Sequence, residues 1–143
     1  MREYRESSRG DGDRAEALVE KIMLDQGIDI KRNASSEVDF TVWSTPSVVN
    51  FHIEVEHKAA HSMAMAERDG MHFLAHKVDK YIDYDHKVFY VMVINDWTEY
   101  YVETMDKILL YGERINIDHL HDRKNLGDVY RVQLRDLKRR SLT

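Results

Sequence analysis

Apolar side chains recur at every third or fourth position in two stretches of this chain, which is the spacing of one face of a helix. The first stretch predicts a helix over residues 13–26 that Gly27 ends, and the second predicts a long helix over residues 62–82. A shorter helix is expected over residues 105–111. The polar residues 1–12 are expected to form a flexible segment. The two stripes consist of Ala15, Leu18, Val19, Ile22 and Met23, and of Met71, Leu74, Ala75, Val78 and Ile82.

Strict alternation of apolar and polar side chains predicts a hairpin of two strands, residues 38–43 and 49–57, with a turn at residues 44–47. A nearly continuous apolar run over residues 87–95 is typical of a buried central strand. The order of these elements predicts an α/β fold in which helices flank a central mixed sheet. Further strands are expected at residues 28–31, at 99–103 and, as an edge strand, at 129–134.

One register of the hairpin matches both faces of its two strands. It places Phe40 opposite Phe51 on the apolar face. On the polar face it places Asp39 opposite His52 and diagonal to Glu54. Because a slip of one residue would turn every side chain to the wrong face, this match favours the register. His52 is then the histidine expected to touch a site built on the polar face.

The polar face of the second hairpin strand carries a row of charges. Glu54 and Glu56 occupy alternate positions, and Lys58 continues the row. Together with Asp39, the two glutamates form a group of carboxylates of the kind that holds a hard divalent cation such as Mg²⁺, so all three are candidate metal ligands. A solvent-exposed strand face would alternate in the same way, but helices packed on the sheet would enclose these charges. Glu16, at the edge of the first apolar stripe, can reach the same sheet.

Composition narrows the classes of function. The 143 residues suffice for a single domain, which is expected over residues 13–143. The formal net charge of −5 argues against a protein that coats nucleic acid through bulk positive charge, but it allows a DNA enzyme whose acidic residues gather in a metal site. The chain has no cysteine, no apolar run near the ~20 residues of a membrane span, and a polar start unlike a secretory signal. These features predict a cytoplasmic protein without disulfides.

The run AEALVEKIMLDQGIDIKRN, followed by EVDFTVW and FHIEVEHK, resembles the PD-(D/E)XK nuclease superfamily, and within it the small archaeal Holliday-junction resolvases. Those proteins begin with a helix that has an Ala-Glu start and a Gly stop. A strand with Val-Asp and a strand reading Ile-Glu-Val-Lys follow. The resemblance covers about residues 13 to 104. It implies a restriction-endonuclease-like core with its elements in the order αβββαβ.

The resemblance also implies roles for individual residues. Glu16 matches the helix carboxylate, Asp39 the first metal ligand and Glu54 the second. This sequence departs from the family pattern at the family's lysine. Aligning its Ile-Glu-Val segment with that of the family puts Glu56 in the lysine position. Sliding the motif by two residues makes Lys58 the lysine, and strand parity keeps both residues on the same face. Either residue can fill this role, and the charge balance favours Lys58 as the cation near the scissile phosphate.

The function that the resemblance implies is that of a Mg²⁺-dependent deoxyribonuclease, in which Mn²⁺ can substitute. Such an endonuclease hydrolyses DNA phosphodiester bonds, and branched or junction DNA is a candidate substrate. A homodimer is expected because two symmetric cuts need two sites. The alternative is a catalytically inactive nuclease-fold module that binds nucleic acid or protein, since a fold does not guarantee an activity. The altered lysine position favours this alternative, and the intact pair of Asp39 and Glu54 favours the enzyme.

Overall fold

Two sheets and the helices around them form the protein in the computed structural model, which describes residues 2–34, 37–58, 67–94, 97, 99–116 and 127–141 without the side chains of 2–11, 58 and 141. The larger sheet has the spatial order β1 (Asp29–Arg32), β2 (Phe40–Thr45), β3 (Val48–Lys58), β5 (Val88–Ile94), β6 (Glu99–Thr104) and β9 (Lys138–Ser141). The smaller sheet has the order β4 (Met71–Leu74), β8 (Asp128–Val132) and β7 (Glu113–Asn116). The helices are α1 (Arg2–Asp25), α3 (Ala75–Tyr81) and α4 (Met105–Tyr111), with a 3₁₀ turn, η1, at Leu134–Asp136.

The larger sheet is mixed. β3 and β5 are parallel neighbours, whereas the other neighbouring strands are antiparallel. The chain passes through β4 and α3 between β3 and β5, which is the kind of crossover that a parallel pair requires. The predicted α/β class, with a mixed sheet flanked by helices and the hairpin beside the strand at residues 87–95, is confirmed.

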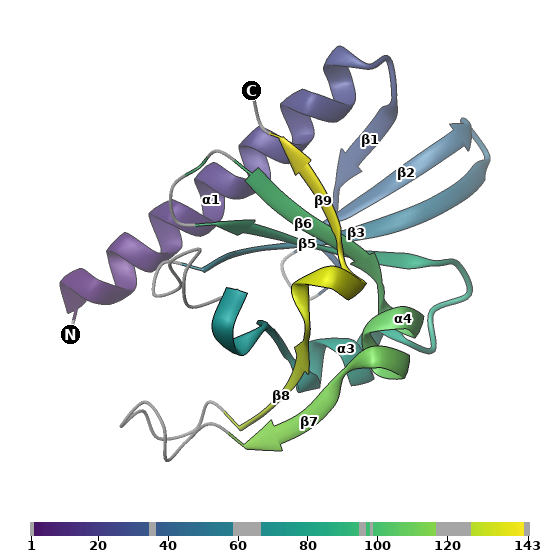
Figure 1. Ribbon diagram of the computed structural model, residues 1–143. Coiled ribbons are helices and arrows are strands. Elements are labelled where there is room, and N and C mark those ends of the chain that lie inside the picture. Colours follow the sequence, from purple (N-terminus) through teal and green to yellow (C-terminus); the bar gives the residue numbers. More distant parts are fainter. Residues whose placement is uncertain are drawn as a thin grey trace.

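The larger sheet buries both of its faces (Figure 1). α1 crosses one face, where Ala15 and Val19 pack with inward side chains of the sheet such as Ile53. The smaller sheet, α3 and α4 lie against the other face, where Tyr90 and Met92 are fully buried. Because side chains alternate along β3, the residues next to Ile53 in sequence point to this second face, toward α3. The polar row of the hairpin is therefore enclosed.

Most of the predicted elements are confirmed within about two residues at each end, including the helix at residues 105–111. The first helix begins earlier than predicted, at Arg2 instead of residue 13. The predicted flexibility of residues 1–12 stays a prediction. No helix in the described ranges is long and apolar enough to cross a membrane.

The predicted helix over residues 62–82 is wrong for part of its length. Residues 71–74 form strand β4, and the helix that follows, α3, is only seven residues long. Gly70 explains the break: it has a φ of +79°, and a Cβ at this position would lie 2.7 Å from the carbonyl oxygen of Val132 on β8. The close approach of β8 thus requires a glycine here. Residues 62–66 lie outside the described residues.

The hairpin is confirmed, but its predicted register is wrong by two residues. Phe40 lies opposite Ile53 instead of Phe51. The cause is a tighter turn, because Thr45 pairs with Val48 and only residues 46–47 connect the strands, instead of the predicted 44–47. The two irregularities of the ladder near the turn cancel each other. Continued by one position, the observed register places Asp39 directly beside Glu54, where the prediction placed it diagonally.

The chain after Gly70 forms more strands than the sequence predicts. β8 was expected at a sheet edge, but it is the middle strand of the smaller sheet, between β4 and β7. β4, β7 and β9 are each four residues long, which is too short for a clear alternation of apolar and polar side chains. From the sequence, residues 118–127 are expected to form a loop, and all of them except Gly127 lie outside the described residues.

Candidate active site

Asp39 is positioned by the turn that leads into β2. The side-chain amide of Asn33 donates hydrogen bonds to the carbonyl oxygen of Val38 at 3.0 Å and to Thr41 Oγ1 at 2.8 Å. The backbone N–H of Asn33 donates to the carbonyl oxygen of Asp39 at 2.9 Å. Asp39 Oδ2 in turn accepts a hydrogen bond from the backbone N–H of Val55, at 2.8 Å. The carboxylate is therefore held against β3, between the backbone positions of Glu54 and Glu56.

Glu54 is the most enclosed of the predicted site residues whose side chains are described. Its side chain is 3% exposed, and it points from β3 toward α3. It forms a hydrogen bond with Asp39 and accepts another from the hydroxyl group of Tyr81 on α3. A buried carboxyl group without a hydrogen-bond partner would be costly, and these two contacts satisfy it.

Glu16 reaches the same place from the other layer of the fold. It follows Ala15, which is fully buried between α1 and the sheet, and its own side chain is half-buried. It forms a hydrogen bond with Asp39 and lies within the electrostatic reach of Arg32. The carboxyl groups of Glu16 and Glu54 thus both contact Asp39, and the structure brings these three predicted residues together from three separate elements.

The pKa values of two carboxyl groups in this site, those of Glu54 and Glu16, are strongly raised. Burial first, and then the hydrogen bond with Asp39, raise the pKa of Glu54 from its ordinary 4.5 to about 9. The same two causes raise the pKa of Glu16 from 4.5 to about 7. At neutral pH the Glu54 carboxyl group therefore keeps its proton, which it can donate to Asp39. A divalent cation would replace this proton and let the carboxylates ionise side by side.

Two residues of α3 complete the surroundings of Glu54, and the sequence analysis did not single them out. Tyr81 donates its hydroxyl hydrogen bond to Glu54, while the Lys77 ammonium lowers the pKa of Glu54 against the larger effect of burial. The two residues are one helical turn apart, so they share a face of α3. Gly70 is the sequence signal that could have identified them. A glycine here indicates a break in the predicted long helix, after which the short helix with Lys77 and Tyr81 is a separate element.

Glu56 lies two positions further along β3 and has a different partner. Its Oε2 accepts a hydrogen bond from the hydroxyl group of Tyr90, a fully buried residue of β5. Burial and the neighbouring Glu56 carboxylate raise the pKa of Tyr90. Lys58, at the end of β3, pairs through its backbone with Ile94 of β5, but its side chain lies outside the described residues. The predicted roles of Glu56 as a ligand and of Lys58 as the cation stay predictions.

His52 does not lie where the sequence analysis placed it. The observed register puts Thr41, rather than Asp39, opposite His52, and His52 Nδ1 is 2.9 Å from Thr41 Oγ1. The ring of His52 also contacts the rings of Tyr84 and His86. Burial and the nearby His86 lower its pKa. His52 therefore supports the turn that holds Asp39, through Thr41, and is not a direct neighbour of that carboxylate.

The carboxylates suit a cation that needs few protein ligands. Within the described residues, no group of three or more His, Cys, Asp or Glu side chains is arranged to hold a metal ion. Asp39 and Glu54 are nevertheless a contacting pair of oxygen donors. Mg²⁺ is usually bound by one or two carboxylates and keeps several waters, and Mn²⁺ has similar ligand preferences. The pair therefore fits Mg²⁺ or Mn²⁺ better than a structural zinc ion, which needs four protein ligands.

Two hollows that the described residues line are separate from the carboxylates. An apolar hollow of about 170 Å³ lies between α1 and the sheet, next to Met23, Phe51 and Tyr100. A polar hollow of about 260 Å³ lies at the end of α3, next to Tyr81 and His86. Neither is lined by the carboxyl groups of the site. The site is therefore recognised by its contacts and charges, not by a cavity.

Comparison with known proteins adds no family to this description. No protein-family model, no curated protein and no solved structure matches the chain. A function for this chain therefore has to be argued from the contacts and charges of Glu16, Asp39 and Glu54, together with the sequence motifs that contain them.

Proposed function

We propose that this protein is a divalent-cation-dependent nuclease that hydrolyses DNA phosphodiester bonds. The observation that carries the proposal is the meeting of Glu16, Asp39 and Glu54 in one hydrogen-bonded group from α1, the start of β2 and β3. Burial of acidic groups side by side is unfavourable unless protons or cations neutralise them. Such an arrangement is common where a protein has a catalytic use for the charge.

The order of the elements supports the same reading. α1, the antiparallel strands β1, β2 and β3, the helix α3 and the parallel strand β5 occur in the order that the resemblance to PD-(D/E)XK nucleases implies, although the extra strand β4 precedes α3. The proposal therefore includes a restriction-endonuclease-like core. DNA as the substrate, and a homodimer as the active form, also come from this resemblance.

Each residue of the group has a chemical task in the proposal. Asp39 and Glu54 would hold the cation, which would supply Lewis acidity next to the scissile phosphate. Hydrolysis forms a bond from a water oxygen to phosphorus and breaks the bond from phosphorus to the leaving oxygen, which takes up a proton. Glu16, with a pKa of about 7, is suited to accept the proton of the attacking water at neutral pH. Tyr81 fixes the direction of the Glu54 carboxylate.

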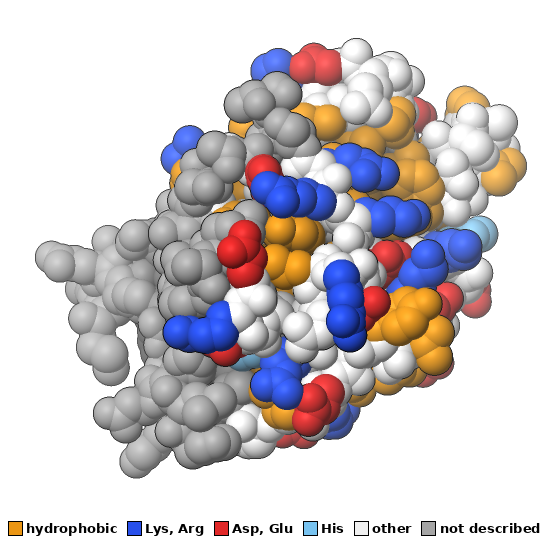
Figure 2. All heavy atoms as spheres, in the orientation of Figure 1, with side chains coloured by type: hydrophobic (Ala, Val, Ile, Leu, Met, Phe, Trp, Pro, Cys, Tyr) orange, Lys and Arg blue, Asp and Glu red, His pale blue; other side chains and the backbone are white. Residues whose placement is uncertain are grey.

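The surface charge indicates that binding of the phosphate depends on the site itself. On the face shown in Figure 2, Lys and Arg side chains are interspersed with Asp and Glu side chains and form no continuous basic surface among the described residues. The net charge of the chain is −5. Cations next to the carboxylates, together with the metal ion, must then attract the scissile phosphate.

The proposal is tested by incubating supercoiled plasmid and a panel of branched, flapped and linear DNAs with the protein and Mg²⁺ or Mn²⁺. Wild-type protein should nick or cleave at least one of these DNAs, and a chelator should stop it. Asp39→Asn and Glu54→Gln should each lower the rate by ~10²-fold or more, because each removes the charge of a ligand. Asp29→Asn, the same change at an exposed position of β1, should leave the rate unchanged.

A second function, that of a non-catalytic binding module, is favoured by one observation. Glu56 occupies the expected lysine position and is held by Tyr90. The same DNA panel separates the two functions: metal-independent binding without cleavage, unaffected by Asp39→Asn, would establish the binding module and contradict the enzyme.

A further inference from the structure

We propose that Lys77 of α3 is the catalytic cation of this site, and that its ammonium group contacts the scissile phosphate and stabilises the charge that develops on it. The inference rests on the proposed nuclease function. It moves the positive charge from β3, where the sequence motif places it, to the helix that covers the carboxylates.

α3 turns one of its faces toward the carboxylates. The Tyr81 hydroxyl group donates a hydrogen bond to Glu54, which fixes the face of α3 that is turned toward the site. Lys77 stands four residues earlier, on the same face, and its side chain is half-buried. Its ammonium group is close enough to Glu54 to interact with that carboxyl group electrostatically.

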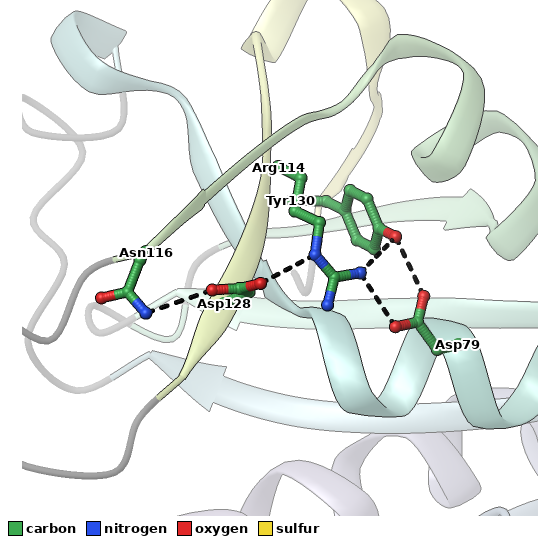
Figure 3. Close-up of polar contacts among 5 residues, drawn as sticks. All are labelled: Asp79, Arg114, Asn116, Asp128 and Tyr130. Atoms are coloured by element: carbon green, nitrogen blue, oxygen red, sulfur yellow. Dashed lines mark hydrogen bonds and ion pairs between the residues drawn. The ribbon is translucent and has the colours of Figure 1, made fainter.

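The other side of α3 is tied to the smaller sheet, which gives Lys77 a defined direction. Asp79 accepts a hydrogen bond from the Tyr130 hydroxyl group at 2.9 Å and another from Arg114 at 2.9 Å (Figure 3). Arg114 also donates to Asp128, at 2.8 Å, and Asn116 donates to the same carboxylate, at 3.1 Å. α3 is only seven residues long, so anchors on both of its sides limit its rotation.

Arg32, another described cation near the carboxylates, is already engaged. Arg32 shares its guanidinium group with Glu20, with nitrogen–oxygen distances of 3.3 Å. In contrast, the described side chains include no salt-bridge partner for Lys77. Its ammonium group is therefore available to a ligand that approaches Glu54.

Charge balance supports a lysine in this position. With Glu16, Asp39 and Glu54 ionised, one divalent cation leaves a net charge of −1, and a phosphodiester adds another negative charge. A nearby ammonium group offsets this repulsion and becomes more favourable as charge builds up on the phosphate oxygens. Glu56 cannot do so because it is itself an acid.

The experiment measures turnover of the most rapidly cleaved DNA at saturating Mn²⁺. Lys77→Met keeps the apolar stem of the side chain and removes the charge, so kcat should fall by ~10²-fold, with a smaller change in KM. Lys77→Arg should recover part of the loss, because it restores a positive charge. Lys21→Ala, which removes an exposed lysine of α1, should behave as wild type.

Mn²⁺ binding, measured on the same variants, separates a catalytic from a structural role. Removal of a nearby positive charge should leave the affinity of Lys77→Met for Mn²⁺ unchanged or raise it. Loss of Mn²⁺ binding together with activity would show that Lys77 only supports the fold, and would overturn the inference. Wild-type turnover by Lys77→Met would overturn it as well, while leaving the nuclease function intact. If wild-type protein cleaves no DNA, the proposed function fails, and the role of Lys77 fails with it.

Discussion

Glu54 is a buried acid whose neighbours are another acid, a tyrosine and a half-buried lysine. The sequence alone could predict that Asp39 and Glu54 would meet, because strand parity places both on one face of the hairpin. It could not predict their direct contact, because that depends on the length of the turn, which closes with Thr45 opposite Val48 instead of Trp43 opposite Val48. Lys77 could not be assigned to the site from the sequence for another reason. The apolar positions of residues 71–82 fit one helix, so they gave no sign that the segment starts with a strand and that a short helix, α3, then covers Glu54.

The raised pKa values predict how stability depends on pH when no cation is present. In the unfolded chain the carboxyl groups lose their protons near pH 4.5, whereas in the folded protein Glu16 and Glu54 keep them up to about 7 and 9. The folded state therefore binds more protons over this interval, and the free energy of unfolding should fall as pH rises from about 5 to about 9.

Glu54→Gln should flatten this dependence. The amide can donate a hydrogen bond to Asp39 as the protonated acid does, without a charge to bury. In chelator at pH 8.5 the variant should be more stable than wild type by about 1–3 kcal/mol, and at pH 5 the two should be similar. Urea unfolding at both pH values measures this. Equal pH slopes for the two proteins would contradict the assignment of a buried, protonated Glu54.

Elements with a regular spacing of apolar side chains were predictable from the sequence. Elements that depend on contact with a strand distant in sequence were not. Alternation gave β2 and β3, a continuous apolar run gave β5, and α4 was predicted at its observed limits. β4 was missed because Met71 and Leu74, at its two ends, also fit a helical stripe. The physical reason for the strand lies in its contact with β8, which is distant in sequence.

Replacing Gly70 by alanine should therefore destabilise the protein more than the same replacement at a glycine that has a similar φ but no neighbouring atoms. Gly70→Ala suffers both the positive φ and a 2.7 Å approach to the carbonyl oxygen of Val132. Gly27, with a φ of +76° and no atom near its Cβ position, is the matched control. We expect Gly27→Ala to lower the free energy of unfolding by about 1 kcal/mol and Gly70→Ala by about 2–4 kcal/mol. Thermal or urea unfolding compares them, and equal losses would show that the contact with β8 is not what requires glycine.

In the whole molecule, the candidate site lies where three layers meet. α1 contributes Glu16, the turn before β2 contributes Asp39, β3 contributes Glu54, and α3 contributes Tyr81 and Lys77. Figure 1 shows α1 and α3 on opposite sides of the larger sheet. The α/β class and the central sheet followed from the sequence, because they depend on the periods of long segments. The smaller sheet did not, because its strands are short and pair across long stretches of chain. That sheet nevertheless matters to the site, because it anchors α3 through Asp79.

In the proposed function Asp39 and Glu54 hold one divalent cation beside Glu16, and this cation displaces the proton of Glu54. Calorimetric titration with Mn²⁺ at pH 7, repeated in two buffers of different ionisation enthalpy, tests it most directly, because the difference between the buffers counts the protons released. Wild-type protein should bind Mn²⁺ with net release of protons, because the Glu54 carboxyl group is protonated at this pH. Asp39→Asn should lose both the binding and the release, and Asp29→Asn should keep them. Wild-type protein that binds no Mn²⁺, or an Asp39→Asn variant that binds it as wild type does, would contradict the account.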